Sequence, residues 1–169
     1  MKVCPYFYTW SQGNNAYQTP SLMSALQKYG LKIAVLAFET IENGWYTNDV
    51  PSMMDDVYKY KAAGGNVAVS FGGEASAGLP LTFAMLDDFT QKYGIKYFDF
   101  DIEGGAETRD DYSQMVAQSC VQYEQKYPDC FLSLTLPVMP DGLDNNGLRV
   151  LNIFAKNNTP LSAINIMTM

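Results

Sequence analysis

The sequence contains no histidine, and this absence removes several common kinds of catalytic and metal site. Without imidazole there is no Ser-His-Asp triad, no Cys-His dyad and no histidine-ligated metal. The three cysteines, Cys4, Cys120 and Cys130, are too few and too scattered for a disulfide scaffold or a zinc site. A disulfide between Cys120 and Cys130 stays open beside the commoner alternative of buried thiols. Chemistry here must rely on carboxylates, tyrosines, amides or backbone groups.

Basic residues and long apolar runs are also scarce. The 169 residues include 11 Lys and Arg against 18 Asp and Glu, which gives a net charge of −7 with no basic cluster. Nucleic-acid binding needs a basic footprint, so no nucleic-acid partner is expected. No run reaches the ~18 apolar residues of a membrane helix, so no membrane partner is expected either. The N-terminus lacks the apolar region and cleavage site of a signal peptide, so the protein is cytoplasmic or a leader lies outside this sequence.

What the chain does have is a regular alternation of apolar strands and helices, at the spacing of about 30 residues that a βαβ unit needs. Helix boundaries are marked by capping residues, glycine and proline, as at Thr19-Pro20, Gly30, Leu79-Pro80 and Pro128. The predicted strands are 3–10, 31–38, 66–71, 95–102, 131–136 and 161–169. The predicted helices are 19–29, 51–63, 79–93, 108–127 and 147–156.

This alternation predicts an α/β fold with a parallel sheet in one domain, residues 1–169. The two candidate architectures are a doubly wound sheet and a (β/α)8 TIM barrel. No Gly-x-Gly-x-x-Gly follows the first strand, so the dinucleotide fingerprint is absent. Polar and glycine-rich segments follow the strands, where a barrel has its catalytic face. We therefore expect the barrel.

The number of predicted strands falls short of a complete barrel. A barrel has eight units, whereas this chain supplies about six and ends within the apolar run 164–169. Natural termini are usually polar, and six strands leave two parallel edges open. We expect an incomplete barrel, completed by a missing C-terminal segment or by a second copy of the chain.

The strongest local signal is the acidic strand 96–105. Because strand side chains alternate between two faces, one face carries an aromatic residue and three acids: Tyr97, Asp99, Asp101 and Glu103. The opposite face is apolar and is expected to contact the helices: Phe98, Phe100 and Ile102. The three carboxylates then point into the barrel, stacked towards the C-terminal end of the strand.

The non-functional alternative is that these acids are solvent-exposed on an edge strand. That alternative is disfavoured, because a mid-chain strand of an α/β fold has both faces covered. Burying three adjacent carboxylates costs several kcal/mol unless they share protons or find donors. Like charges push pKa values apart and keep one acid protonated near neutral pH, as general acid catalysis requires. The pattern therefore favours a functional site.

The segment 99–103 resembles the Asp-x-Asp-x-Glu core of the family 18 glycoside hydrolases, the chitinase family, which lies on the fourth strand of a (β/α)8 barrel. Ser70-Phe71-Gly72-Gly73 matches the family's Ser-x-Gly-Gly on strand three. Residues 165–169, Asn-Ile-Met-Thr-Met, resemble the start of its Met-x-Tyr/Met-Asp segment on strand six. Residues 134–143 on strand five are like those of bacterial secreted chitinases. The resemblance covers essentially the whole chain, at barrel units one to six.

The resemblance implies a role for each acid. Glu103 would protonate the glycosidic oxygen and later activate water, while the substrate's own 2-acetamido group is the nucleophile. Asp101 would orient that group and stabilise the charge developing on it. Asp99 would lie beneath, ~6.6 Å along the strand, and share a proton with Asp101. Chitin or chito-oligosaccharides are the implied substrates, no metal or cofactor is needed, and the family implies a secreted protein.

Two departures from the family pattern stand out. A fourth acid expected three residues before Asp99 is Lys96 here, and that acid takes the least direct part in the chemistry. The Asp or Asn and the Tyr expected after Met169, and a tryptophan beneath the reacting sugar, are not in the chain. Part of the sugar subsite is therefore expected to be missing.

Further residues are candidates for lining the substrate subsite. The aromatic residues and Met139 have core packing as an alternative explanation, and the glycines have tight turns. These candidates are Tyr6, Phe38, Ser70, Gly72, Gly73, Met139, Asn165 and Met167. Trp45 and Tyr46, after strand two, are expected either to stack on sugars or to anchor a loop by one buried ring.

The sequence therefore predicts a chitinase-like hydrolase and leaves three alternatives. The first is a chitinase-like lectin that binds sugar without cleavage, a class that usually loses the acid at the position of Glu103. The second is an endo-β-N-acetylglucosaminidase, which the motifs do not separate from a chitinase because loops shape the cleft. The third is an inactive fragment whose motif records ancestry only.

Overall fold

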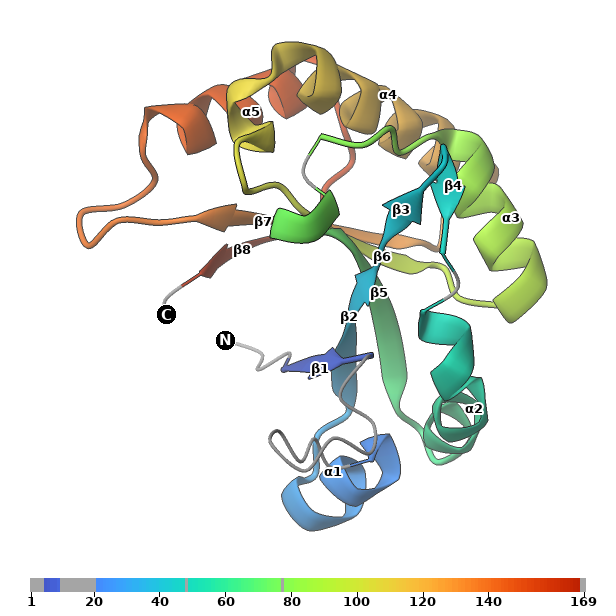
Figure 1. Cartoon of the computed structure of the whole chain (residues 1–169). Coiled ribbons are helices and arrows are strands. Elements are labelled where there is room, and N and C mark those ends of the chain that lie inside the picture. Colours follow the sequence, from blue (N-terminus) through green and yellow to red (C-terminus); the bar gives the residue numbers. More distant parts are fainter. Residues whose placement is uncertain (1–4, 10–20, 48, 77, 168–169) are drawn as a thin grey trace.

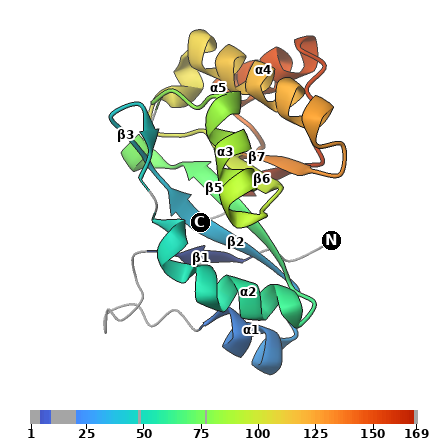
Figure 2. The same ribbon diagram turned by 90° about the vertical axis from the view of Figure 1, so that its right-hand side faces the viewer.

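A computed structural model describes residues 5–9, 21–47, 49–76 and 78–167 of the chain. Its main feature is a six-stranded parallel sheet with strand order β1-β2-β5-β6-β7-β8. Each new strand joins the sheet beside the one before it, without the reversal of order that defines a doubly wound sheet. The sheet curls, and the helices lie on its outer side (Figure 1; Figure 2). The prediction of a barrel-type α/β fold with about six units is confirmed.

The strands lie close to their predicted positions, and most are shorter. The sheet comprises β1 (Tyr6–Tyr8), β2 (Ile33–Glu39), β5 (Asn66–Gly72), β6 (Tyr97–Asp101), β7 (Phe131–Pro137) and β8 (Ala163–Met167). A small antiparallel hairpin of β3 (Ile41–Glu42) and β4 (Trp45–Tyr46) follows β2 and was not predicted. Two-residue strands carry too little periodicity to be recognised in a sequence.

The helices are α1 (Leu22–Tyr29), α2 (Met54–Ala62), α3 (Phe83–Tyr93), α4 (Asp110–Lys126) and α5 (Asn145–Lys156). Short 3₁₀ turns are η1 (Val50–Met53), η2 (Glu74–Ser76) and η3 (Ala106–Thr108). Gly30 and Gly94 end α1 and α3 in the left-handed conformation, as their sequence positions predict.

Two predicted helix starts need correction. The sequence predicts Thr19-Pro20 as the start of the first helix; these two residues lie outside the described ranges, and the N-cap is Ser21, whose hydroxyl accepts a hydrogen bond from the Ser24 amide. The third helix begins at Phe83 and not at Leu79-Pro80. The buried Ser119 hydroxyl donates to the carbonyl of Leu81, which holds this approach in a non-helical course.

The core lies between the outer face of the sheet and the helices. Phe71 on β5 and Phe98 on β6 pack on Phe89 of α3, with ring centroids 5.9 and 6.0 Å apart. Phe98 also contacts Tyr123 of α4 at 5.3 Å. The apolar residues of β6 therefore face the helices, and the alternate residues of the strand are left for the concave side.

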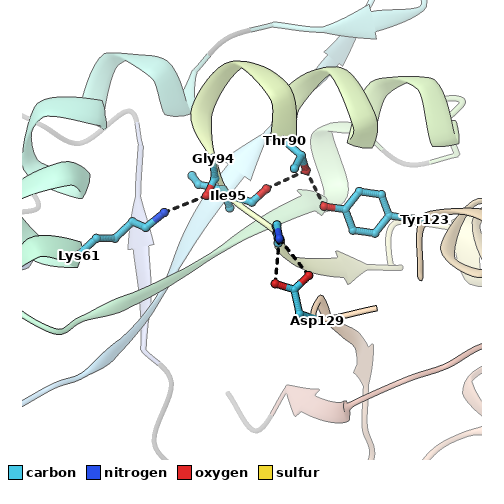
Figure 3. A network of polar contacts seen from close by, with 7 residues as sticks. Lys61, Thr90, Gly94, Ile95, Tyr123 and Asp129 are labelled. Atoms are coloured by element: carbon cyan, nitrogen blue, oxygen red, sulfur yellow. Dashed lines mark hydrogen bonds and ion pairs between the residues drawn. The ribbon is translucent and has the colours of Figure 1, made fainter. Parts of the chain in front are cut away.

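The N-terminal end of the sheet is joined by polar contacts (Figure 3). Lys61 of α2 donates to the carbonyl of Gly94, and Thr90 of α3 donates to the carbonyl of Ile95. Lys96 pairs with both oxygens of Asp129, at 2.9 and 2.8 Å. Lys96 thus has a structural partner at the end of β6 opposite to Glu103.

The two outermost strands of the sheet, β1 and β8, do not pair with each other. On the outer face of β8, Ile164 and Ile166 are 50% and 52% exposed. The expectation of two open edges is therefore confirmed for the described chain.

Cys120 and Cys130 are free thiols, and Cys4 lies outside the described residues. No helix in the described ranges is both long enough and apolar enough to span a membrane.

Candidate active site

The concave face of the sheet carries a cluster of acids centred on β6. Asp99 is fully buried, Asp101 is 4% exposed, and Glu103 is partly exposed just beyond the end of the strand. Asp99 lies opposite Ser70 of β5 and Ser133 of β7 in the strand register. Asp101 lies opposite Gly72 and Thr135 in the same way. The period-two pattern of β6 thus places both aspartates on the concave face.

The Asp99 carboxylate accepts hydrogen bonds from five side chains. Oδ2 accepts from the Tyr6 hydroxyl at 2.6 Å and from Ser70 at 2.8 Å. Oδ1 accepts from Ser133 at 2.5 Å and from Asn165 at 3.1 Å, and Thr135 lies within 3.1 Å of both oxygens. These donors compensate the burial of the charge, which is costly without them. They come from four strands, β1, β5, β7 and β8, so the cluster connects both edges of the sheet.

Asp101 is in the opposite situation. Its Oδ1 is buried and has no hydrogen-bond partner among the described residues. Burial first, then the neighbouring charges of Glu103 and Asp99, raises the pKa of Asp101 to about 8. Asp101 therefore carries a proton at neutral pH, and an acid with such a pKa is suited to proton transfer.

The predicted proton shared between Asp99 and Asp101 is not seen as a hydrogen bond. Within residues 5–9, 21–47, 49–76 and 78–167, no hydrogen bond joins the two carboxyl groups. The physical reason is that Asp99 is occupied by hydroxyl and amide donors from the neighbouring strands. Asp99 acts on Asp101 through its charge.

Tyr6 and Phe38, predicted to line the subsite, are neighbours in the structure. Their rings meet edge to face with centroids 6.2 Å apart. Burial, followed by the charge of Asp99, raises the pKa of Tyr6 well above its usual value, so the phenol remains a hydrogen-bond donor. Phe38 is partly buried and follows Ala37 through a cis peptide bond.

The two glycines after β5 have conformational and packing roles. Gly72 has φ +116°, and a Cβ there would lie 2.1 Å from the carbonyl oxygen of Asp101. Gly73 has φ +72°, and its amide donates to the same carbonyl. Close approach of β5 to β6 therefore requires glycine at position 72. The structure accounts for these glycines without a sugar.

The remaining candidates differ in their surroundings. Met139 is 59% exposed in a turn closed by backbone hydrogen bonds to Gly142. Asn165 and Met167 lie partly buried on one face of β8, and Asn165 reaches Asp99. Tyr46 is buried against Phe89 with its hydroxyl bonded to Asp88, while Trp45 is exposed. Of the two alternatives for this loop, anchoring by one buried ring is the one seen.

Two polar residues of the concave face and one buried acid at the end of β2 were not identified as candidates from the sequence. Ser133 and Thr135 both bond to Asp99, and the signal for them is their alternation with apolar residues along β7. Glu39 at the end of β2 is fully buried and accepts from the amides of Asp49 and Val50. Nothing in the local sequence distinguishes Glu39 from a surface acid.

Fold and site together define a class: a barrel-type α/β protein with a buried carboxylate cluster at the C-terminal ends of its strands, where barrel enzymes have their active sites. No protein-family model matches the chain. Among curated proteins, the chain is 32% identical to a probable bifunctional chitinase/lysozyme of Escherichia coli (strain K12), over 64% of this chain and 13% of that protein. It is 28% identical to endochitinase 11 of Metarhizium anisopliae, over 89% of this chain and 32% of that protein.

Solved structures agree on the fold. The catalytic domain of a hyperthermophilic chitinase from Pyrococcus furiosus superposes with a TM-score of 0.77 at 24% identity, covering 98% of this chain and 56% of that chain. Human YKL-39, described as a pseudo-chitinase with retained chitooligosaccharide binding, has a TM-score of 0.69 at 14% identity, covering 96% and 50%. This chain thus has chitinases as its relatives and the fold of a chitinase barrel. It spans about half the length of these structures and a third or less of the curated relatives.

Proposed function

We propose that this chain carries the acidic half of a chitinase-like glycoside hydrolase site that cleaves β-1,4 bonds between N-acetylglucosamine units. The observation that carries the proposal is the acidic series on β6, in which buried Asp99 and protonated Asp101 lead to the accessible Glu103. Two chitinase relatives in sequence support the reaction type, and solved complexes of the Pyrococcus furiosus chitinase with chito-oligosaccharides support the substrate class.

In the proposed reaction the protonated Glu103 carboxyl gives its proton to the glycosidic oxygen. The carbonyl oxygen of the substrate's own 2-acetamido group attacks the anomeric carbon as the bond to the leaving sugar breaks, and an oxazolinium ion forms. Glu103, now a carboxylate, takes a proton from water as that water attacks the anomeric carbon. The two inversions give net retention, and Glu103 regains its proton.

Asp101 has two tasks in this scheme. This proton is close to Glu103, so its transfer to Glu103 when substrate binds would protonate the general acid. The Asp101 carboxylate that remains would then face the positive oxazolinium ion and stabilise it. The raised pKa of Asp101, caused by burial and by Glu103 and Asp99, is consistent with such a transfer at neutral pH.

The test is release of fluorophore from a chitobioside or chitotrioside by this chain and by its Glu103→Gln variant. We expect the variant to lose at least about 100-fold in kcat, the usual contribution of a general acid. Glu42→Gln, which changes an exposed acid on the β3–β4 hairpin, is the matched control and should retain the parent rate. Equal rates in Glu103→Gln and the parent chain would refute the assigned role.

A non-catalytic sugar-binding protein is the second candidate, because the pseudo-chitinase YKL-39 shares the fold. The presence of Glu103 favours the enzyme. Binding of chito-oligosaccharides by calorimetry, without any hydrolysis by the chain or by a chain extended beyond residue 169, would favour the binding protein instead.

A further inference from the structure

The end of β2 contains one residue more than the neighbouring strand β5. Ala37 is in register with Ser70, and the next pair is Glu39 with Phe71. Phe38 is therefore an extra residue of β2, and such a β-bulge redirects the side chains around it. With strict alternation Glu39 would share the concave face with Ala37. The bulge turns Glu39 to the outer face, the face on which Phe71 packs against α3.

Glu39 is fully buried in this position. A buried acid is costly unless donors surround it. Oε2 of Glu39 accepts from the Val50 amide at 2.9 Å. Oε1 accepts from the Asp49 amide at 3.2 Å and from the Thr47 hydroxyl at 3.3 Å. Both oxygens are used, so the acid ties the bulged end of β2 to the start of η1.

Thr9, directly after β1, holds the same bulge from the other side. Its amide donates to the carbonyl of Ala37 at 2.8 Å, and its hydroxyl donates to the carbonyl of Phe38 at 3.1 Å. Thr9 is buried, so water competes little for these hydrogen bonds. Buried groups on both sides therefore fix the backbone of the bulge.

The bulge places the Phe38 ring beside the acids of the candidate site. The ring meets that of Tyr6 edge to face, and a Cβ on Gly73 would lie 3.0 Å from it. Both neighbours contact the acidic strand: Tyr6 donates to the carboxylate of Asp99, and the Gly73 amide donates to the carbonyl of Asp101. Phe38 is only partly buried, so part of its ring is accessible at this end of the sheet.

We propose that Glu39, together with Thr9, is a positioning residue for Phe38, and that the ring held in this way contacts the sugar on which Glu103 acts. An apolar side chain could fill the buried place of Glu39, but it could not bind the two amides that fix the bulge. A ring held in place before binding contacts the sugar without an ordering cost. The inference rests on the proposed function, because it assigns these residues to the same site.

The first experiment measures kcat and KM on a fluorogenic chitobioside for the parent chain and for Glu39→Gln. Glutamine has the same shape but replaces one acceptor oxygen with a donor, so one of the two amides loses its partner. We expect KM to rise about fivefold with a smaller change in kcat, because a displaced ring weakens sugar binding. Partial unfolding alone would lower the apparent kcat and leave KM unchanged.

Thr90→Val is the matched control for this experiment. It removes a buried hydroxyl that donates to the Ile95 carbonyl at the opposite end of the sheet. This variant should lose stability and keep the parent KM. A fivefold rise of KM in Thr90→Val as well would show that general destabilisation, and not the bulge, changes sugar binding.

A double-mutant cycle tests whether Glu39 acts through Phe38. Phe38→Ala should raise KM by a similar factor, and Glu39→Gln should then add at most about twofold in the Phe38→Ala background. Independent effects would multiply to about 25-fold. An increase close to that product would overturn the inference.

A second readout does not depend on activity. The nuclear Overhauser effect between the ring protons of Phe38 and Tyr6 should be present in the parent chain and in Thr90→Val, and strongly weakened in Glu39→Gln. Thr9→Val removes only the hydroxyl that bonds to the Phe38 carbonyl; it should weaken the same signal and serves if Glu39→Gln does not fold.

The two readouts separate failure of the inference from failure of the proposed function. Absence of hydrolysis by the parent chain would refute the proposed function for this chain, while the ring signal would still decide whether Glu39 and Thr9 position Phe38. An unchanged ring signal in Glu39→Gln, or in Thr9→Val where that variant is used, would overturn the inference.

Discussion

At the scale of single residues, two aspartates on one strand have opposite environments. Asp99 is surrounded by hydroxyl and amide donors, whereas Oδ1 of Asp101 is buried without a partner in the described part of the chain. Their Cα positions differ by only two residues of β6, and the difference comes from what the neighbouring strands present at each level. Paired acids with divergent environments are how a site obtains different roles from the same side chain.

The raised pKa of Asp101 predicts how stability depends on pH. The folded chain keeps this proton up to about pH 8, while the unfolded chain loses it near the ordinary value of 3.8. The folded state therefore binds more protons in this window, and the group lowers stability as pH rises, by up to about 1.4 kcal/mol per unit. Urea unfolding at pH 5 and pH 8 should show a smaller loss of stability in Asp101→Asn than in the parent. The same loss in both proteins would contradict the assignment.

At the scale of elements, the site depends on how closely β5 approaches β6. Ser70 and Gly72 face Asp99 and Asp101 across this pair, and the backbone of Asp101 leaves no room for a side chain at position 72. The fold uses the same residue type differently at Gly94, where the left-handed conformation ends α3 in open space. Alanine would therefore have both a contact cost and a backbone cost at position 72, and a backbone cost alone at position 94.

This contrast predicts unequal effects of alanine. Gly72→Ala adds a Cβ 2.1 Å from a backbone oxygen that cannot move without shifting β6, so we expect a loss of about 3 kcal/mol or more. Gly94→Ala has φ +65° but no atom within 4 Å, so we expect about 1 kcal/mol from backbone strain alone. Chemical unfolding of both variants measures the difference, and equal losses would show that the close approach of the strands is not the cause.

At the scale of the whole molecule, the sheet is curled (Figure 1), and its two edge strands, β1 and β8, do not pair with each other in the described part of the chain. Its concave face carries the polar groups that surround Asp99. Exposed strand edges and apolar side chains on β8 are sites for pairing with another chain. The side chains of Ile164 and Ile166 lie on the outer face, opposite to Asn165. Association through this edge therefore need not disturb the hydrogen bonds of Asp99.

We expect this chain to self-associate with increasing concentration, as seen by sedimentation velocity. The double variant Ile164→Lys and Ile166→Lys should be more monomeric, because charges on an edge strand oppose pairing. Tyr29→Lys is the control, because Tyr29 is 60% exposed on α1. This helix connects β1 and β2, which lie at the opposite end of the strand order from β8. A monomeric parent chain, or equal association of the double variant and the parent, would contradict a role for this edge.

The sequence by itself determined the alternation of strands and helices and the two faces of β6. These follow from local rules, since side-chain periodicity and capping residues act within a few positions. Local rules also locate the acids 99, 101 and 103, and the resemblance of three further segments agrees with them. The hairpin β3–β4 and the start of α3 at Phe83 were missed because tertiary contacts decide them.

Only the tertiary structure decided which groups surround each acid. Ser133 and Thr135 reach Asp99 from 34 and 36 residues away, and Tyr6 from 93, through strand register. Strand register is a property of the assembled sheet, so no local sequence pattern predicts which residues pair. Within the described ranges the same register leaves Oδ1 of Asp101 without a donor, and burial with the charges of Glu103 and Asp99 raises the pKa of Asp101. The sequence identifies the acids of this site, and the packing of the strands determines that Asp101 is the one whose pKa is raised.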